Sequence, residues 1–508
     1  MKPTRVLLFL FSVLLTLVLV SLFFPGEGLR IGHGVVLSFP SIREHFPEVF
    51  SRGSLPAVSH GDVSAPDSLS ADTVAMIVET RDVDTWPAVH FIDSSGLHLD
   101  RLLAHPRRIE YPDTTFRVMR SFFPSLYRLS KGRGRARILH YGDSQIEGDR
   151  ITSHLRHMLQ QRFGGTGYGL FPAVQVVQDG VSLRFTHSDH WDRFTWRHYR
   201  DSVIDHTRFG LLHSYCSFHL DKKDAWASLR VRKAPSALSG ALHYKRGRVF
   251  YGQVTAPLYM EVQQNETLCF RDSIIPSPGF RETRWNSPPA AIRDLEIRFS
   301  STAAPEIYGI TLEDTAGIMV DNIPLRGSAG LEFSKIDPDL FRSMANALDV
   351  KLMILQFGVN VVPGETADFR WYTKGFHWQL AYLRQLLPGI DLLVVGVNDM
   401  GHRMDGKVVS YDNVEKVRDA LKDAALRAGV PFWDTYLAMG GKNSMQHWVH
   451  HDPSLARPDY THFSFMGSKI IATLLHDALM ADYRDYAAGL DSLQIVPART
   501  NDSPGKTY

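Results

Sequence analysis

Cysteine is nearly absent from this chain of 508 residues, which contains only Cys216 and Cys269. Two cysteines exclude a scaffold that is held together by several disulfides. In an exported chain they could close one disulfide, or they could be two separate buried thiols, and the sequence leaves both possibilities open. No histidine cluster at ligand spacing accompanies them, so they do not form a metal site, and we expect neither a metal nor a cofactor.

An excess of charge of one sign is absent as well. The chain has 56 lysines and arginines against 54 aspartates and glutamates, a formal net charge of +2, and its basic residues are spread rather than massed. This balance gives no support to nucleic-acid binding, so we expect no nucleic acid among the partners. Neutral or mildly charged small molecules or polymers are the expected partners.

One long hydrophobic run is present, at the N-terminus. Residues 6–24 are 19 residues without a charge, preceded by Lys2 and Arg5. This length is enough to span a bilayer, whereas a cleaved signal has a shorter apolar core and small residues at its cleavage site. We therefore predict an uncleaved membrane anchor in residues 1–25, with a cleaved signal and secretion as the alternative. The basic residues before the span predict that the body lies outside the cytoplasm.

The region after this run has a weakly structured composition. Residues 51–72 are rich in Ser, Pro, Gly and Asp, which is typical of linkers and loose surface segments. We predict that residues 26–112 form a linker or poorly defined segment. Residues 486–508 are predicted as a C-terminal tail.

Two separated parts of the chain alternate strand-like and helix-like patterns. Residues 113–182 and 306–485 carry apolar runs such as KLMILQFG at 351–358, followed by amphipathic helix patterns. This alternation predicts one α/β domain with a parallel sheet and helices on both faces. Between them, residues 183–305 contain short strand-like runs separated by turn residues. They predict an inserted all-β domain, like a sandwich or a jelly roll.

A serine stands where a predicted strand meets a predicted helix. The run ARILHYG ends at Gly142, and Ser144 follows two residues later. A serine hydroxyl becomes a nucleophile only with a base, and the base needs an orienting group. The stretch ARPDYTHFS supplies Asp459 and, three residues later, His462. Because ligand chemistry in such sheets lies beyond the carboxyl ends of the strands, we expect His462 to accept the Ser144 proton and Asp459 to orient the imidazole.

Acyl transfer also needs hydrogen-bond donors for the oxyanion. The backbone N–H of Ser144 is one candidate. The glycine-bearing loop RGSAG at 326–330 could bring a second backbone N–H close, since glycine permits close approach and unusual dihedral angles. Asn360, at the end of FGVN, would be the third donor through its side-chain amide.

Four motifs together resemble the sequence blocks of the GDSL-like, or SGNH, hydrolase family. They occur in the family's order and approximate places: Gly142-Asp143-Ser144, a glycine loop ending at Gly330, Gly358-x-Asn360 and Asp459-x-x-His462. The resemblance covers residues 115–182 and 306–485. It implies a flavodoxin-like three-layer SGNH hydrolase domain that carries the all-β insertion. It also implies ester hydrolysis by Ser144, His462 and Asp459.

The family pattern also selects among the oxyanion candidates. It places the glycine donor at the second glycine of the loop, Gly330, with Gly327 as the alternative. The third block often reads Gly-x-Asn-Asp, whereas Val361 follows Asn360 here. Residues 396–399 match that block literally but come one strand later, so the position along the chain favours Asn360.

The stretch HYGDSQIEGDRIT looks most like exported bacterial carbohydrate or peptidoglycan O-acetylesterases. This resemblance, the export segment and the β-insert predict a serine esterase of the bacterial cell envelope, periplasmic or otherwise extracytoplasmic. Its expected reaction is removal of O-acetyl groups from a glycan, with an acetylated glycan and the membrane as partners. An SGNH-type O-acetyltransferase is the main alternative. A lipase or thioesterase, for which we see no apolar lid helix, and a non-catalytic glycan-binding protein are weaker ones.

Two further stretches combine aromatic and histidine residues. Trp448 precedes the Asp-His motif in QHWVHHDP and could stack on a sugar ring, although a packed loop aromatic is the plainer interpretation. Residues 187–201 mix His, Asp and aromatic residues at irregular spacing. We expect a solvated, partly packed segment there, with metal binding as the weaker alternative.

Overall fold

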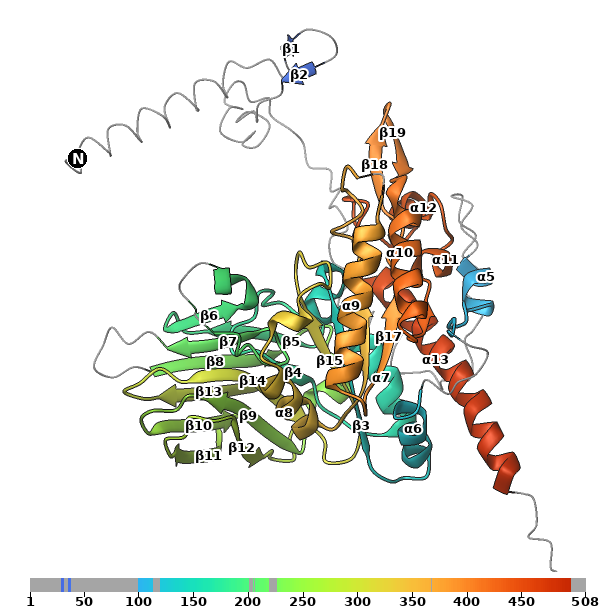
Figure 1. Cartoon of the computed structure of the whole chain (residues 1–508). Helices are drawn as coiled ribbons and strands as arrows, with labels where there is room; N and C mark the ends of the chain where they lie inside the picture. Colours follow the sequence, from blue (N-terminus) through green and yellow to red (C-terminus); the bar gives the residue numbers. More distant parts are fainter. Residues whose placement is uncertain are drawn as a thin grey trace, which may run out of the picture. The chain divides into compact units, whose positions relative to one another are not determined.

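The computed structural model of the chain describes residues 29–31, 35–37, 99–112, 119–200, 204, 206–218, 226–366 and 368–494. The chain divides into two compact units, residues 1–69 and 70–508. In the first unit, strand β1 (Leu29–Ile31) pairs antiparallel with β2 (Val35–Leu37). The second unit contains all the other elements described below (Figure 1).

The predicted anchor, residues 1–25, lies outside the described residues, as does most of the linker predicted for residues 26–112. Within the described part of the chain, none of the helices is long and apolar enough to cross a membrane. At the other end, helix α13 (Phe465–Gln494) continues past residue 485, so the predicted tail begins inside a helix. The anchor therefore stays a prediction from the sequence.

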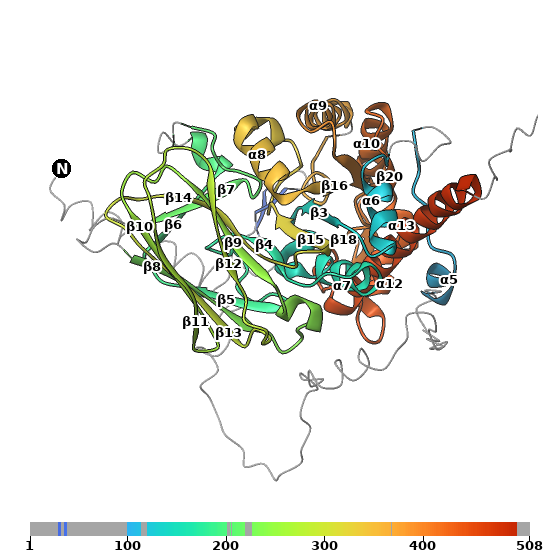
Figure 2. The same cartoon turned by 90° about the horizontal axis from the view of Figure 1, so that it is seen from below.

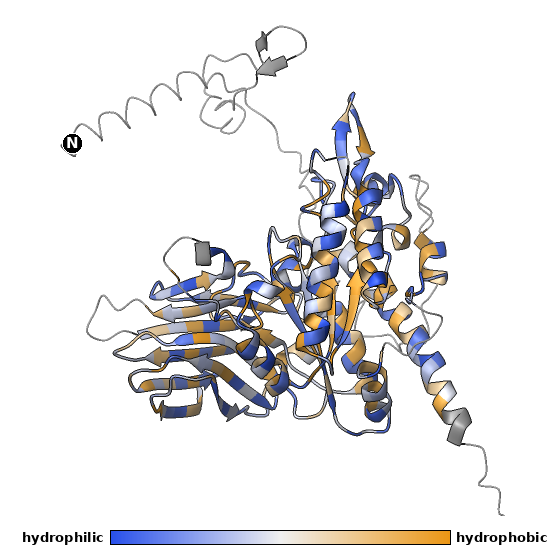
Figure 3. Cartoon of the chain, in the orientation of Figure 1, coloured by the Kyte–Doolittle hydropathy of each residue, from blue (hydrophilic) through white to orange (hydrophobic). Residues whose placement is uncertain are grey.

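The second unit contains a five-stranded sheet in which all neighbouring strands are parallel. In spatial order the strands are β15 (Gly317–Pro324), β3 (Arg135–Gly142), β16 (Val350–Gln356), β17 (Asp391–Val395) and β20 (Phe432–Trp433). Their side chains are almost all buried, and most of β17 is coloured as hydrophobic in Figure 3. Near-continuous apolar runs are typical of parallel strands that are covered on both faces. The predicted mixed α/β class with a parallel sheet is confirmed.

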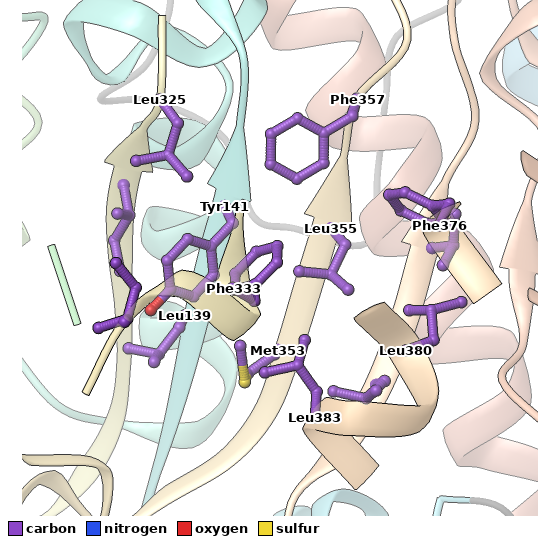
Figure 4. Close-up of a cluster of buried hydrophobic side chains, with 14 of the residues drawn as sticks. Leu139, Tyr141, Leu325, Phe333, Met353, Leu355, Phe357, Phe376, Leu380 and Leu383 are labelled. Atoms are coloured by element: carbon purple, nitrogen blue, oxygen red, sulfur yellow. The ribbon is translucent and has the colours of Figure 1, made fainter. Parts of the chain in front are cut away.

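Helices cover both faces of the parallel sheet. Because successive side chains of a strand point to opposite faces, Leu139 and Tyr141 of β3 belong to one buried cluster and Ile138 belongs to another. Helices on the face of Tyr141 are α8 (Pro338–Leu348), α9 (Arg370–Leu386) and α10 (Asn413–Arg427). Figure 4 shows part of this cluster, with Tyr141, Leu355 and Leu380 among the labelled side chains. Helices on the face of Ile138 are α6 (Phe122–Ser130), α7 (Thr152–Phe163) and α13.

The described strands between β3 and β15 along the chain form two antiparallel sheets. They are β4 (Gly169–Phe171), β5 (Leu183–His187), β6 (Trp191–Thr195), β7 (Ser214–Phe218), β8 (Trp226–Lys233), β9 (Arg246–Gly252), β10 (Leu258–Gln264), β11 (Thr267–Ile274), β12 (Arg281–Asn286), β13 (Asp294–Ser300) and β14 (Glu306–Glu313). One sheet has the order β11-β10-β13-β8-β5, and the other has the order β12-β9-β14-β7-β6 with β4 paired to β14.

The two antiparallel sheets pack face to face (Figure 2). Their shared core includes Leu229 and Ile297 from one sheet and Val249 and Ile310 from the other. Since β4 and β14 pair with each other, antiparallel pairing begins before residue 183 and continues past residue 305, the bounds expected from the sequence.

Short elements complete the described part of the chain. They are α5 (Leu99–Ala104), the hairpin of β18 (Gly401–Met404) and β19 (Lys407–Ser410), α11 (Thr435–Ala438) and α12 (Ser444–His450). The hairpin is attached to the start of α12, because Ser410 Oγ accepts the backbone N–H of Asn443 at 2.7 Å.

A buried ionic cluster links the parallel sheet to the antiparallel strands. Arg137 of β3 lies 2.8 Å from the carboxylate of Asp321 in β15 and also pairs with Glu313 of β14. Arg248 of β9 approaches the same Glu313 carboxylate at 3.1 Å. Asp321 also accepts the backbone N–H of Leu170 in β4 at 2.9 Å. The four charged side chains, called the seam cluster below, are at most 3% exposed, so each depends on its partners for charge compensation.

The two cysteines are free thiols. Cys216 is buried in β7, whereas Cys269 is half-buried in β11 of the other antiparallel sheet. The disulfide that the sequence left open is therefore not formed. The alternative of two separate thiols is the correct one, although only Cys216 is fully buried.

Candidate active site

Ser144 opens a short 3₁₀ helix, residues 144–149, directly after β3. Gly142 is the last residue of that strand. A Cβ atom there would lie 2.9 Å from the carbonyl oxygen of Gln356, so the close approach of β3 to the end of β16 requires glycine. The serine therefore lies at the carboxyl end of a strand inside the parallel sheet, where chemistry in open α/β folds is located.

The structure brings the predicted triad together, although 318 positions separate Ser144 from His462 along the chain. Ser144 Oγ is 2.8 Å from His462 Nε2, and His462 Nδ1 is 2.8 Å from Asp459 Oδ2. Asp459 Oδ1 accepts the backbone N–H groups of Thr461 and His462, each at 2.9 Å. Burial raises the pKa of Asp459, but these hydrogen bonds outweigh burial and hold its pKa below the ordinary value. The carboxylate thus stays ionised and builds the turn that presents the imidazole.

Asp143, next to the serine, is buried. Burial raises the pKa of its carboxyl group to about 7, although hydrogen bonds from backbone N–H groups act in the opposite direction. One of these donors is the backbone N–H of Gln145, 3.0 Å from Asp143 Oδ1. By accepting this N–H, the Asp143 side chain caps the short helix. Asp143 therefore supports the turn that carries Ser144.

Gln145 holds the serine turn against the histidine loop, a role that the sequence analysis missed. Its Nε2 donates to the carbonyl oxygen of Thr461 at 2.7 Å and to Asn398 Oδ1 at 2.8 Å. Its Oε1 accepts the backbone N–H of Phe463 at 3.2 Å. Thr461 and Phe463 flank His462, so the glutamine fixes the loop on both sides of the base. Only its place directly after Ser144 could have marked it, because its partners are far away along the chain.

Arg150 ties together the same two segments. Its Nη2 donates to the carbonyl oxygen of Ser144 at 2.6 Å, and its Nη1 donates to that of Phe463 at 3.2 Å. Burial lowers the pKa of this guanidinium to about 10, which leaves it charged at neutral pH. The sequence alone does not mark Arg150 either, because an arginine near the start of a helix pattern is common.

Replacing Gln145 by alanine is expected to lower kcat about tenfold to 100-fold and to change KM less, because His462 would lose its fixed position relative to Ser144. Steady-state kinetics on an aryl acetate measure both constants. Gln263→Ala, at a half-buried glutamine of β10 whose side chain donates to Glu261 Oε1 at 2.7 Å, is the matched control. Equal kcat for the Gln145 variant and its control would contradict the positioning role.

The glycine donor predicted from the family pattern needs a correction. The Gly330 N–H donates to Ser328 Oγ at 2.8 Å, and Gly330 is buried. The prediction of Gly330 as oxyanion donor is wrong, because an N–H that is bonded within its own loop is not available to a substrate. Gly327 is exposed, has a φ of +71°, and its N–H has no hydrogen-bond partner among the described residues. The alternative, Gly327, is therefore the better candidate.

Asn360 is exposed in the loop after β16. Its Nδ2 donates to the carbonyl oxygen of Ser328 at 2.9 Å, which leaves the second amide hydrogen for a ligand. The same bond ties this loop to the one that carries Gly327. Asn398, the literal match to the third block, is 1% exposed and uses both ends of its amide inside the protein. Burial and these bonds remove Asn398 as a candidate donor.

Trp448 does not reach the site. It lies on α12 with 0% of its surface exposed, and its Nε1 donates to the carbonyl oxygen of Met439 at 2.9 Å. Its ring packs against Phe463, with centroids 5.3 Å apart. The prediction of Trp448 as a sugar-binding residue is wrong, because a fully buried ring has no face left for a substrate.

A serine, a histidine and a carboxylate in one hydrogen-bonded chain at the carboxyl end of a parallel sheet form the arrangement of serine hydrolases. In the part of the chain that the structure describes, no group of three or more His, Cys, Asp or Glu side chains is placed to hold a metal ion.

Comparison with known proteins gives a match in fold. No family model matches the chain, and no curated protein matches it. A solved structure described as "Peptidoglycan O-acetylesterase in action, 5 min" aligns with a TM-score of 0.56 and 22% identity, over 72% of this chain and 96% of that one. A family two carbohydrate esterase from Clostridium thermocellum, in complex with cellohexaose, aligns with a TM-score of 0.24 and 8% identity over 52% of this chain and 96% of that one. The acetyl xylan esterase AlAXEase aligns with a TM-score of 0.23 and 14% identity, over 32% of this chain and 82% of that one.

Only the first alignment is close enough to support an argument, and at 22% identity it speaks for the fold. The chain shares the fold of a solved peptidoglycan O-acetylesterase. The resemblance to esterases that the four motifs indicated is confirmed at that level.

Proposed function

We propose that the protein is a serine esterase that removes O-acetyl groups from an extracytoplasmic glycan, such as peptidoglycan or another polysaccharide. The observation that carries this proposal is the hydrogen-bonded chain from Ser144 Oγ through His462 to Asp459, with both contacts at 2.8 Å. The fold shared with a peptidoglycan O-acetylesterase supports the substrate class.

In the proposed reaction, His462 Nε2 takes the proton of Ser144 Oγ as the oxygen attacks the acetyl carbonyl carbon. Asp459 steadies the imidazolium that forms. The negative oxygen of the tetrahedral intermediate accepts hydrogen bonds from the backbone N–H groups of Ser144 and Gly327 and from Asn360 Nδ2. Collapse expels the sugar oxygen, which receives the proton from His462 and leaves an acetyl group on Ser144. A water molecule, activated by His462, then releases acetate.

The finer structural and cellular assignments belong to the same proposal. We assign residues 113–182 and 306–485 to a flavodoxin-like three-layer SGNH hydrolase domain, and the antiparallel strands to an inserted all-β domain. The position of all these strands between β3 and β15, which are neighbours in one sheet, supports an insertion. The apolar run in residues 1–25 supports an anchored protein of the bacterial envelope, or a secreted one if the run is cleaved.

Acetate release from O-acetylated peptidoglycan, O-acetylated xylan and a short-chain aryl acetate tests this function. We expect release from at least one polymer by the wild-type protein and none by Ser144→Ala. Turnover of the aryl ester alone would contradict glycan deacetylation. The acetyltransferase alternative would then be examined by adding a sugar acceptor and measuring acetylated sugar.

Replacing Asn360 by alanine is expected to lower kcat by about 10²- to 10³-fold, the usual effect of removing one oxyanion donor. KM should change little, because the bond forms to the oxyanion rather than to the ester carbonyl. Asn286→Ala, at an exposed asparagine of β12, is the control. If both variants keep the wild-type kcat, Asn360 is not an oxyanion donor.

A further inference from the structure

A cavity of about 300 Å³ lies between the antiparallel strands and the end of the parallel sheet. Glu147 and Gly148, from the short helix that begins with Ser144, form part of its wall. Arg326, the residue before Gly327, forms another part, and Arg193 of β6 lies on the opposite, antiparallel side. The cavity therefore adjoins the serine turn and the proposed oxyanion loop, and its size is at the lower end of ligand pockets.

Several buried polar atoms around this cavity have no hydrogen-bond partner. They are Nε of Arg193 and both ring nitrogens of His213. His213 is 1% exposed, and burial lowers its pKa to about 3, so its ring is neutral. More than nine in ten buried polar groups in folded proteins are hydrogen-bonded. Unpaired atoms from two separate segments around one cavity therefore indicate a polar occupant.

The charge around the cavity is positive. Arg193, Arg197 and Arg326 line it against a single carboxylate, that of Glu147, whose Oε1 is 3.5 Å from Arg326 Nε. Arg193 is half-buried, its Nε has no hydrogen-bond partner among the described residues, and burial lowers its pKa. A partly desolvated cation favours a nearby negative charge, and a neutral sugar does not supply one. A carboxylate does, since it matches the fork of an arginine with two parallel hydrogen bonds.

An arginine on an edge strand has a plainer use, which is to prevent pairing between sheet edges. β6 is an edge strand of its sheet. That use requires neither a cavity beside the arginine nor the unpaired ring of His213 in the same wall. Ligand binding accounts for the arginine, for the cavity beside it and for the unpaired ring of His213.

We propose that this cavity is a subsite for a carboxylate group of the glycan substrate, carried close to the acetylated sugar and bound mainly by Arg193. The assignment rests on the proposed esterase function and narrows its substrate to acidic glycans. Two sources carry this chemistry: a uronic acid ring, or a peptide carboxylate attached to the sugar.

Matched pairs of substrates test the subsite. O-acetylated pectin and O-acetylated peptidoglycan are each compared with the same preparation after carbodiimide-driven amidation, which makes the carboxylates neutral and leaves the acetate esters. For the source that fits, we expect amidation to raise KM for the wild-type protein about tenfold and to change kcat less, which corresponds to about 1.4 kcal/mol of binding. Equal KM values for both members of both pairs would overturn the proposal.

Arg193→Gln is expected to abolish the difference between native and amidated substrate, and Arg193→Lys is expected to keep part of it. Arg284→Gln, at an exposed arginine of β12 in the same sheet, is the matched control and should keep the full difference. A full difference in Arg193→Gln would exclude Arg193 as the binding group.

A second measurement separates failure of the subsite from failure of the proposed function. If no glycan loses acetate while Ser144-dependent aryl acetate turnover persists, glycan deacetylation fails. The subsite is then tested by comparing the unfolding temperature of the wild-type protein in galacturonate with that in galactose. The same comparison replaces the variant experiment if Arg193→Gln does not fold. A higher unfolding temperature with galacturonate alone supports the subsite, and no difference between the two sugars overturns it.

Discussion

Replacing either Ser144 or His462 by alanine is expected to lower kcat for acetyl ester hydrolysis by about 10⁴- to 10⁶-fold. Without Ser144 no acetyl-enzyme forms, and without His462 the hydroxyl keeps its proton. The effects should not add, because the two groups act as one unit through the 2.8 Å contact between Oγ and Nε2. The double variant should therefore be about as slow as either single variant.

Single-turnover and steady-state rates on an aryl acetate measure these losses. His243→Ala, at an exposed histidine of the antiparallel region, is the matched control and should keep wild-type kcat. Loss of activity in His462→Ala but not in Ser144→Ala would mean that another nucleophile uses this histidine. A double variant much slower than both single variants would mean that the two residues act in separate steps.

Removing one member of the seam cluster is expected to be the most damaging change for stability. Asp321→Ala should lower the free energy of unfolding by about 3–5 kcal/mol, because it leaves the Arg137 guanidinium with an incomplete set of partners. Asp321 is 0% exposed and also accepts the backbone N–H of Leu170. The substitution would weaken the contact between the parallel sheet and the antiparallel strands.

Urea unfolding at neutral pH, followed by circular dichroism and tryptophan fluorescence, measures this effect. Asp339→Ala, at a carboxylate that is 87% exposed and paired with Arg342, is the control and should change stability by less than about 1 kcal/mol. Similar midpoints for Asp321→Ala and the control would show that the seam cluster contributes little. Non-coincident transitions by the two probes would indicate that the antiparallel strands unfold separately.

Local patterns in the sequence were sufficient for the outline of this protein. The apolar run ending at Gly142 and the helix pattern after it predict the strand-to-helix turn at Ser144, because strand and helix periods are properties of a few neighbouring residues. Asp459 and His462 are also a local pair, since three residues of chain let the carboxylate bond to the backbone and the ring of the histidine. The alternation of strand-like and helix-like patterns along the chain was sufficient to predict the parallel sheet.

The errors concern groups whose state depends on neighbours that are distant along the chain. Trp448 is an aromatic residue of the type that can stack on a sugar ring, but packing against Phe463 and the core buries it. Gly330 satisfies the family pattern, but the Ser328 hydroxyl takes its N–H. The apolar run of β14 does not by itself determine its sheet, which is decided by its partners β4 and β9.

The order of the elements along the chain, the positions of the proposed triad residues and the class of the fold follow from the amino-acid sequence, because each depends on short-range periodicity and spacing. Which donor is free at the proposed oxyanion site, and how Gln145 and Arg150 fix the loop that carries His462, depend on the tertiary structure. So does the meeting of Arg193 and His213 at one cavity. These features arise from contacts between segments far apart in the chain, and burial or a competing hydrogen bond decides each one.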